Sequence, residues 1–320
     1  MTLNQLLNLA VLTFKERNLR DPAEADRFFI EYGVGNTVDF AISPYERFTY
    51  YRDLLRRLRA SDPQKFDSMH KGTPLYFLSW LAFDQHLFES ALHFIDAAIA
   101  EDRRTGQGWF NKPASQILML NSQVQVSPRT VDWMASQIDG ELQRFEQRFG
   151  IAFPREAFLR RFAEPEVKGG TPAIVAAFYA FVFEFDDREI EIGLRIEPVL
   201  GSYQPLFIHL FKGGLLLETL LKRRFPHLAS EVLGSILNSN EFKSSFGFKT
   251  GSTHGVSVSV LCADAAATTP ESAFLTTGRL RSMMGHNLIG DPLPTVPDDY
   301  SRLVRQEIDA FLYAVEKLCP

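Results

Sequence analysis

Apolar residues recur at helical spacing along almost the whole chain, and this period constrains the fold more than any other feature. Near the start, Leu6, Leu9 and Leu12 follow one another at intervals of three residues. The same kind of spacing runs through 44–60 and 203–225. An apolar repeat of three to four residues places one stripe of an α-helix against a core. We therefore expect an all-α protein.

The segment 73–104 predicts two helices that form a hairpin. Thr73 and Pro74 fit a helix N-cap followed by proline in the first turn. Small residues such as Ala82, Ala91 and Ala98 alternate with large ones, and this pattern resembles a tetratricopeptide hairpin, in which two antiparallel helices approach closely. A repeat array needs about three copies, and the likeness covers one. We interpret the segment as a hairpin within a larger bundle.

The segment 123–128 interrupts the helical pattern and predicts a boundary between two packed helical domains, 1–125 and 126–320. The sequence Ser127-Pro128 suits the start of a long helix that continues to about Phe149. Further helices are expected in the C-terminal domain at 154–162, 172–185, 203–225, 271–284 and 299–318.

Two stretches fit a second interpretation, a minor β element. Ile190, Ile192, Leu194 and Ile196 alternate strictly with other residues, and a similar alternation of valines runs through 256–260. Half-buried strands show this period of two. The stretches 188–198 and 255–261 are therefore either short strands that pair or parts of helices.

Charge and cysteine content narrow the functional classes. A net charge of −5 argues against a protein that coats nucleic acid, and we interpret the arginines within 44–60 as a solvated helix face rather than a basic stripe.

Cys262 and Cys319 form no CxxC pair, which indicates free thiols of a reducing, cytoplasmic compartment. The longest apolar run, 173–183, is well short of the roughly 20 residues of a membrane span. We expect no membrane segment.

Several familiar motifs are absent from the sequence. No GxSxG, HExxH or GxGxxG pattern occurs, and Lys212-Gly213-Gly214 falls inside a helical pattern, which indicates helix packing rather than a phosphate loop. The acids at 184–187 are either a solvated cluster or a cation site, and we favour the cluster. His209 lies among apolar residues, so we interpret it as a hydrogen-bonded core histidine rather than a catalytic one.

The segment 278–287 holds the strongest candidate for chemistry. Arg281 precedes His286 with four residues between them, and Arg279 precedes it with six. This spacing resembles that of the HEPN superfamily, whose ribonucleases carry an arginine and a following histidine on a helical bundle. The likeness at motif level covers only this segment of the C-terminal domain. The resemblance implies a homodimer that joins two motifs in one cleft, an RNA substrate, and a role as a bacterial toxin or defence effector.

The residue types suit RNA cleavage. Imidazole titrates near neutral pH, so His286 is expected to act as general acid and base on the ribose 2′-hydroxyl. A guanidinium offers parallel donors to phosphate oxygens, which is the role expected of Arg281, and the neighbouring Ser282 and Asn287 are candidate substrate contacts. Such a scheme needs neither a metal ion nor a cofactor.

Helix geometry leaves the choice of arginine open. On one straight helix Arg281 and His286 point about 140° apart, whereas Arg279 and His286 lie within about 20° of each other. Arg281 remains the partner if Gly285 ends the helix or if a second protomer completes the site. The alternative is that none of these residues is catalytic. Both arginines would then be cations in the last turns of a helix that interact with its dipole, and His286 would be a polar loop residue.

A rival from another functional class is a non-catalytic helical scaffold. In that interpretation the hairpin at 73–104 binds a protein partner, and 278–287 has no chemical role.

Overall fold

The structure is a computed structural model that describes residues 2–33, 42–106, 108–194, 204–249, 253, 258–266, 268–284 and 297–319. Every regular element within these ranges is helical, which confirms the all-α expectation. The chain divides into two compact units, Met1–Asp132 and Trp133–Pro320, whereas the sequence placed the boundary at 125–126. The division falls inside a helix rather than in the preceding loop.

The first unit is built from short and medium helices. They are α1 (Leu3–Glu16), α2 (Pro22–Tyr32), α3 (Pro44–Ser61), α4 (Pro63–Ser68), α5 (Gly72–Phe83), α6 (Phe88–Thr105) and α7 (Pro113–Leu118), with 3-10 turns at Trp109–Asn111 and Ser122–Val124. The helix α8 (Pro128–Phe149) begins in this unit and continues into the second.

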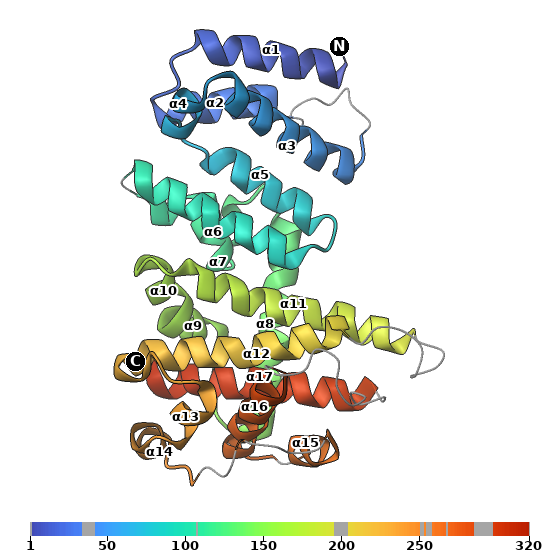
Figure 1. Cartoon of the computed structure of the whole chain (residues 1–320), viewed down its shortest axis with the longest axis vertical. Helices are drawn as coiled ribbons and strands as arrows, with labels where there is room; N and C mark the ends of the chain where they lie inside the picture. Colours follow the sequence, from blue (N-terminus) through green and yellow to red (C-terminus); the bar gives the residue numbers. More distant parts are fainter. Residues whose placement is uncertain are drawn as a thin grey trace. The chain divides into compact units, whose positions relative to one another are not determined.

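The second unit contains the longer helices. After α8 come α9 (Arg155–Phe158), a π-helical turn (Leu159–Ala163), α10 (Glu164–Lys168), α11 (Pro172–Gly193), α12 (Gln204–Arg224), a 3-10 turn (Pro226–Leu228), α13 (Leu233–Asn238), α14 (Asn240–Phe246), α15 (Val258–Ala265), α16 (Pro270–Met284) and α17 (Pro297–Leu318). Figure 1 shows α11, α12 and α17 as neighbouring helices, with α16 packed against α12 and α17.

Local sequence signals explain where many helices begin. Proline lacks a backbone N–H and has a fixed φ, so the first helical position accepts it without loss of a hydrogen bond. Thr2 and Ser43 cap α1 and α3 in capping boxes with Gln5 and Glu46. The helices that start on a proline are α2, α3, α4, α7, α8, α11, α16 and α17.

The hairpin expected at 73–104 is confirmed by α5 and α6, which lie side by side in Figure 1. Its predicted cap is wrong in detail, because α5 begins at Gly72 and no side chain caps it. The Thr73 hydroxyl instead donates to Asp26 Oδ1 at 2.7 Å. Thr73 thus lies inside the first turn of α5, and its hydroxyl contacts a partly buried carboxylate of α2 instead of capping the helix.

The arginines at 52, 56, 57 and 59 of α3 are exposed, and two of them also form polar contacts within the first unit. Arg57 donates to Asn4 and Asn8 of α1, while Arg56 is largely exposed and pairs with Asp53 one turn earlier. These contacts agree with a solvated face rather than a dedicated basic surface.

Aromatic packing fills the second unit between α11 and α17. The rings of Phe178 and Phe311 stack with centroids 4.4 Å apart, and Phe158 and Phe162 pack around them. Each of these rings is almost fully buried. Offset and edge-on ring contacts add to the free energy of burial, so this cluster contributes to the packing of α17 against α11.

The strand interpretation is wrong over the residues that the structure describes. Residues 190–193 continue α11, and residues 258–260 begin α15, while Ile196 and Val256 lie outside the described residues. Phe185 and Ile192 are buried two helical turns apart, whereas Ile190 is 62% exposed. The burial period is thus helical, because α11 packs one face on the bundle and leaves the alternate isoleucine in solvent.

None of the described helices combines the length and apolar content of a membrane span.

Candidate functional site

Three of the predicted site residues lie on the last turns of α16. Arg279, Arg281 and Ser282 are part of this helix, and each is partly buried. His286 and Asn287 lie outside the described residues, as does Gly285, on which the predicted end of the helix depends.

Arg281 is held in a defined position by α12. Its Nε–H donates to Glu218 Oε2 at 3.2 Å, and its guanidinium carbon lies 4.6 Å from the ring centroid of Phe211. The side chain keeps 22% of its surface exposed. An ion pair along one edge and a ring beneath the plane fix the orientation of the guanidinium before any ligand binds.

Glu218 joins three elements of the second unit. Besides Arg281 it accepts a hydrogen bond from Lys222 Nζ at 2.7 Å and from the backbone N–H of Leu233 at 3.3 Å. Its side chain is 9% exposed. Two cations and one carboxylate leave this cluster with one net positive charge. That balance favours an anion at the exposed edge of Arg281.

The two glycines of α12 allow its close contact with α16 and α17. A Cβ atom on Gly214 would lie 2.7 Å from the Cβ of Arg281, closer than real Cβ atoms approach. A Cβ atom on Gly213 would overlap the carboxyl group of Glu307 on α17. The interpretation of Lys212-Gly213-Gly214 as helix packing is therefore confirmed.

The structure distinguishes the environments of the two candidate arginines. They are two residues apart on α16, so their side chains leave the helix about 160° apart. Arg281 is the one placed against Glu218 on α12. Only one of the two arginines can therefore belong to a site on this side of α16.

His209 is a core histidine, as the sequence indicated. Its ring is 1% exposed and stacks on Phe181 at 4.4 Å between centroids. Burial lowers the pKa of His209 to about 3, so the ring is neutral. Because a carbonyl oxygen only accepts, Nε2–H donates to Phe181 O at 2.8 Å, and Nδ1 accepts from the Tyr300 hydroxyl at 2.7 Å.

The acids at 184–187 have protein partners. Glu184 pairs with Lys212 on α12 at 3.1 Å. Burial raises the pKa of Asp186, as do the nearby acids Glu189 and Glu141. Among the described residues, no group of three histidine, cysteine or acidic side chains has the geometry to hold a metal ion.

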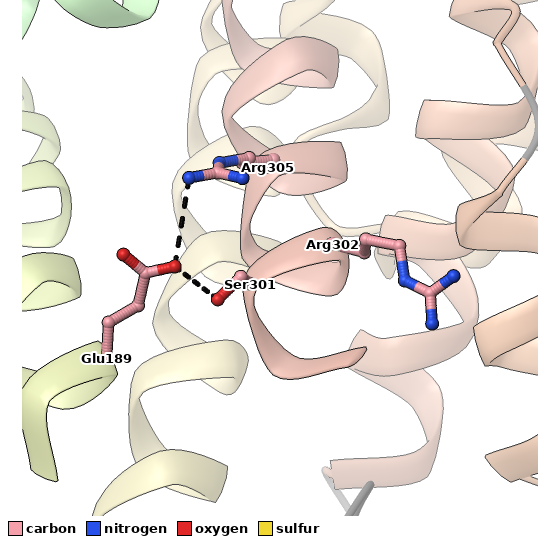
Figure 2. A pocket seen from close by; sticks show the side chains of 4 residues that line it. All are labelled: Glu189, Ser301, Arg302 and Arg305. Atoms are coloured by element: carbon pink, nitrogen blue, oxygen red, sulfur yellow. Dashed lines mark hydrogen bonds and ion pairs between the residues drawn. The ribbon is translucent and has the colours of Figure 1, made fainter. Parts of the chain in front are cut away.

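A second polar site is a surface pocket of about 350 Å³ between α11 and α17 (Figure 2). Glu189 accepts a hydrogen bond from the Ser301 hydroxyl and lies 3.7 Å from Arg305. Figure 2 shows these three side chains converging while Arg302 turns away. Arg302 pairs with Asp299 instead. The charged side chains of this pocket are thus paired with other side chains of the protein, so the pocket is a poor candidate site for an ionic ligand.

Sequence reasoning missed a buried histidine in the first unit. His70 is 2% exposed, and its Nδ1 and Nε2 each lie 3.0 Å from a carboxylate oxygen, of Asp26 and Asp102 respectively. Lys112 also pairs with Asp102, at 2.9 Å. No sequence motif predicts this network, because its four residues lie in four separate segments of the chain.

The remaining polar signals are structural. Cys262 and Cys319 are free thiols, and the buried Cys319 accepts a hydrogen bond from Arg224 at 3.1 Å.

Comparison with family models, curated proteins and solved structures finds no match to this chain. The candidate function therefore depends on the geometry of the chain's own residues.

Proposed function

We propose that this chain is a metal-independent endoribonuclease of the HEPN type that acts as a homodimer. The observation that supports the proposal is the fixed guanidinium of Arg281, five residues before His286. Glu218 and Phe211 orient it, and its edge remains partly exposed in a cluster of net positive charge. An oriented guanidinium is suited to a phosphodiester that gains negative charge during reaction.

In the proposed reaction His286 accepts the proton of a ribose 2′-hydroxyl. The 2′-oxygen attacks the adjacent phosphorus, the bond to the 5′-oxygen breaks, and the protonated His286 returns the proton to the leaving oxygen. Arg281 stabilises the phosphate oxygens, and Ser282 and Asn287 contact the substrate. The products are a 2′,3′-cyclic phosphate and a 5′-hydroxyl. The resemblance to toxin and defence proteins suggests that this cleavage restricts growth or infection.

The decisive experiment incubates single-stranded RNA with the protein in excess chelator. Cleavage with cyclic-phosphate ends is expected, and both Arg281→Ala and His286→Ala are expected to reduce its rate by at least about a hundredfold. Arg302→Ala is the matched control, because this arginine pairs with Asp299 on its own helix. Undiminished cleavage by His286→Ala contradicts the proposal.

Arg279→Ala decides between the two arginines. If Arg279 serves the histidine on one straight helix, its loss abolishes cleavage and the loss of Arg281 does not. If Arg281 is the phosphate ligand, the result is reversed. Glu218→Gln is expected to lower the rate less than Arg281→Ala, because it removes the orienting charge and keeps the guanidinium.

A second candidate is a helical scaffold that binds a protein partner through 73–104. The observation that favours it is the tip of the α5–α6 hairpin, where Leu87 is 47% exposed beside the exposed His86. A partner captured by the native chain and lost with Leu87→Glu, in a protein without ribonuclease activity, supports this function. Retention of every captured partner by Leu87→Glu contradicts it.

A further inference from the structure

The first unit contains a pocket of about 490 Å³ between α2, α3, α5 and the segment that follows the 3-10 turn at 122–124. Its walls include Tyr51, Phe77, Trp80 and Leu81. Tyr51, Trp80 and Leu81 are each less than a tenth exposed, so these walls are fixed by the core behind them. The size and the aromatic lining are those of a site for a small molecule.

Two apolar side chains that line the pocket remain exposed to solvent. Ile30 is 43% exposed and Val126 is 63% exposed, and both line the pocket. A ligand with an apolar body would remove this surface from water, which is favourable.

Two opposite charges line the same pocket. Arg47 is in the first turns of α3, close to the positive end of that helix dipole, and Asp84 is the C-cap of α5, at the negative end of the other. Burial raises the pKa of Asp84, and the positive charge of Arg47 opposes that rise. Each helix end has the same sign as the side chain beside it, so the two potentials add and favour a ligand group of the opposite charge. A ligand that covers both must supply an anion to one and a cation to the other, because burying an unpaired charge is costly.

We propose that this pocket binds a small zwitterion with a large apolar body, such as an α-amino acid with an aromatic side chain. The carboxylate would pair with Arg47, the ammonium group with Asp84, and the side chain would lie against Phe77 and Trp80. This inference is independent of the proposed ribonuclease function, because every residue it uses belongs to the first unit.

The test is calorimetric titration of the full chain with L-phenylalanine. Saturable binding with a dissociation constant between about 1 μM and about 1 mM is expected. N-acetyl-L-phenylalanine, which lacks the ammonium group, and L-phenylalanine amide, which lacks the carboxylate, are each expected to bind about tenfold or more weakly. This comparison uses the unaltered protein, so it does not depend on any variant folding.

Variants then assign each charge. Arg47→Gln is expected to weaken L-phenylalanine binding at least about tenfold and to leave binding of the amide unchanged. Asp84→Asn is expected to weaken L-phenylalanine similarly and to leave the N-acetyl compound unchanged. The matched controls are Arg52→Gln, on the same helix as Arg47, and Asp96→Asn, whose carboxyl also has a pKa raised by burial.

Three results overturn the proposal. The first is no saturable heat with L-phenylalanine up to about 10 mM. The second is equal binding of L-phenylalanine and its two blocked analogues. The third is an equal loss of binding in the control variants.

Discussion

Raising the pH from about 7 to about 9 is expected to destabilise the first unit, because it removes a proton that His70 holds between two carboxylates. The geometry requires that proton. Both ring nitrogens lie 3.0 Å from a carboxylate oxygen, and an ionised carboxylate only accepts hydrogen bonds, so both nitrogens must carry hydrogen. The ring is therefore an imidazolium, although it is 2% exposed.

The magnitude follows from the pKa of this histidine. Burial by itself lowers the pKa, but hydrogen bonds to Asp102 and Asp26 outweigh it and raise the pKa of His70 from 6.5 to about 9. Such a rise on folding corresponds to about 3 kcal/mol of stability. Because the folded-state pKa is the higher one, this stability is present below about pH 6.5 and is lost as the pH rises through about 9. Between about pH 7 and about pH 9 the expected loss is about 2 kcal/mol.

The assay is urea unfolding of the native chain and of His70→Gln at both pH values, followed by fluorescence of the tryptophans in the first unit. The difference in the free energy of unfolding between the two proteins is expected to shrink by about 2 kcal/mol at the higher pH. A difference that stays constant refutes the reasoning. An NMR titration of the native His70 ring gives an independent measurement, and a midpoint near 6.5 would also refute it.

Three further predictions concern the second unit. Gly214→Ala is expected to lower the free energy of unfolding by about 1–3 kcal/mol, because its Cβ would collide with Arg281. Gly140 on α8 has open space around it, so Gly140→Ala should raise the free energy of unfolding by about 0.5–1 kcal/mol. Chemical denaturation measures both changes. His209 should show no NMR titration between about pH 5 and about pH 8, since burial lowers its pKa to about 3. Asp309→Asn should cost about 3 kcal/mol in thermal unfolding, because it removes the buried carboxylate that pairs with two partly buried arginines, of which Arg144 keeps Glu141 as a second partner.

The arrangement around the candidate site was only partly readable from the sequence. The i,i+4 spacing of Glu218 and Lys222 is a visible signal for a pair on one helix. Their link to Arg281 joins residues far apart in the chain, and no local pattern predicts it. The position of Arg281 on the last turn of its helix was expected, while its use of Glu218 as a partner was not.

The alternation at 190–194 left a strand or a helix open, and the cap expected at Thr73 is wrong; the local pattern decided neither outcome. Alternating apolar residues suit a strand only if the alternate side chains face a core, and α11 instead buries Ile192 with Phe185 and exposes Ile190. A threonine caps a helix from the position just before it, whereas α5 begins at Gly72, so Thr73 lies inside the first turn and its hydroxyl donates to Asp26. In both cases the place of the residue in the packed helix, rather than the local pattern, decided the outcome.

The sequence by itself determined the all-α class, the start of many helices at prolines and the apolar stripe of each long helix. These properties depend on backbone sterics and on a period of 3.6 residues, and both act over one or two turns. Tertiary structure alone decided which charges from distant segments meet, as in the imidazolium of His70 and the fixed guanidinium of Arg281. Such pairs form where packed helices bring distant residues within a few ångströms, and burial then gives each contact a strength that its sequence position does not reveal.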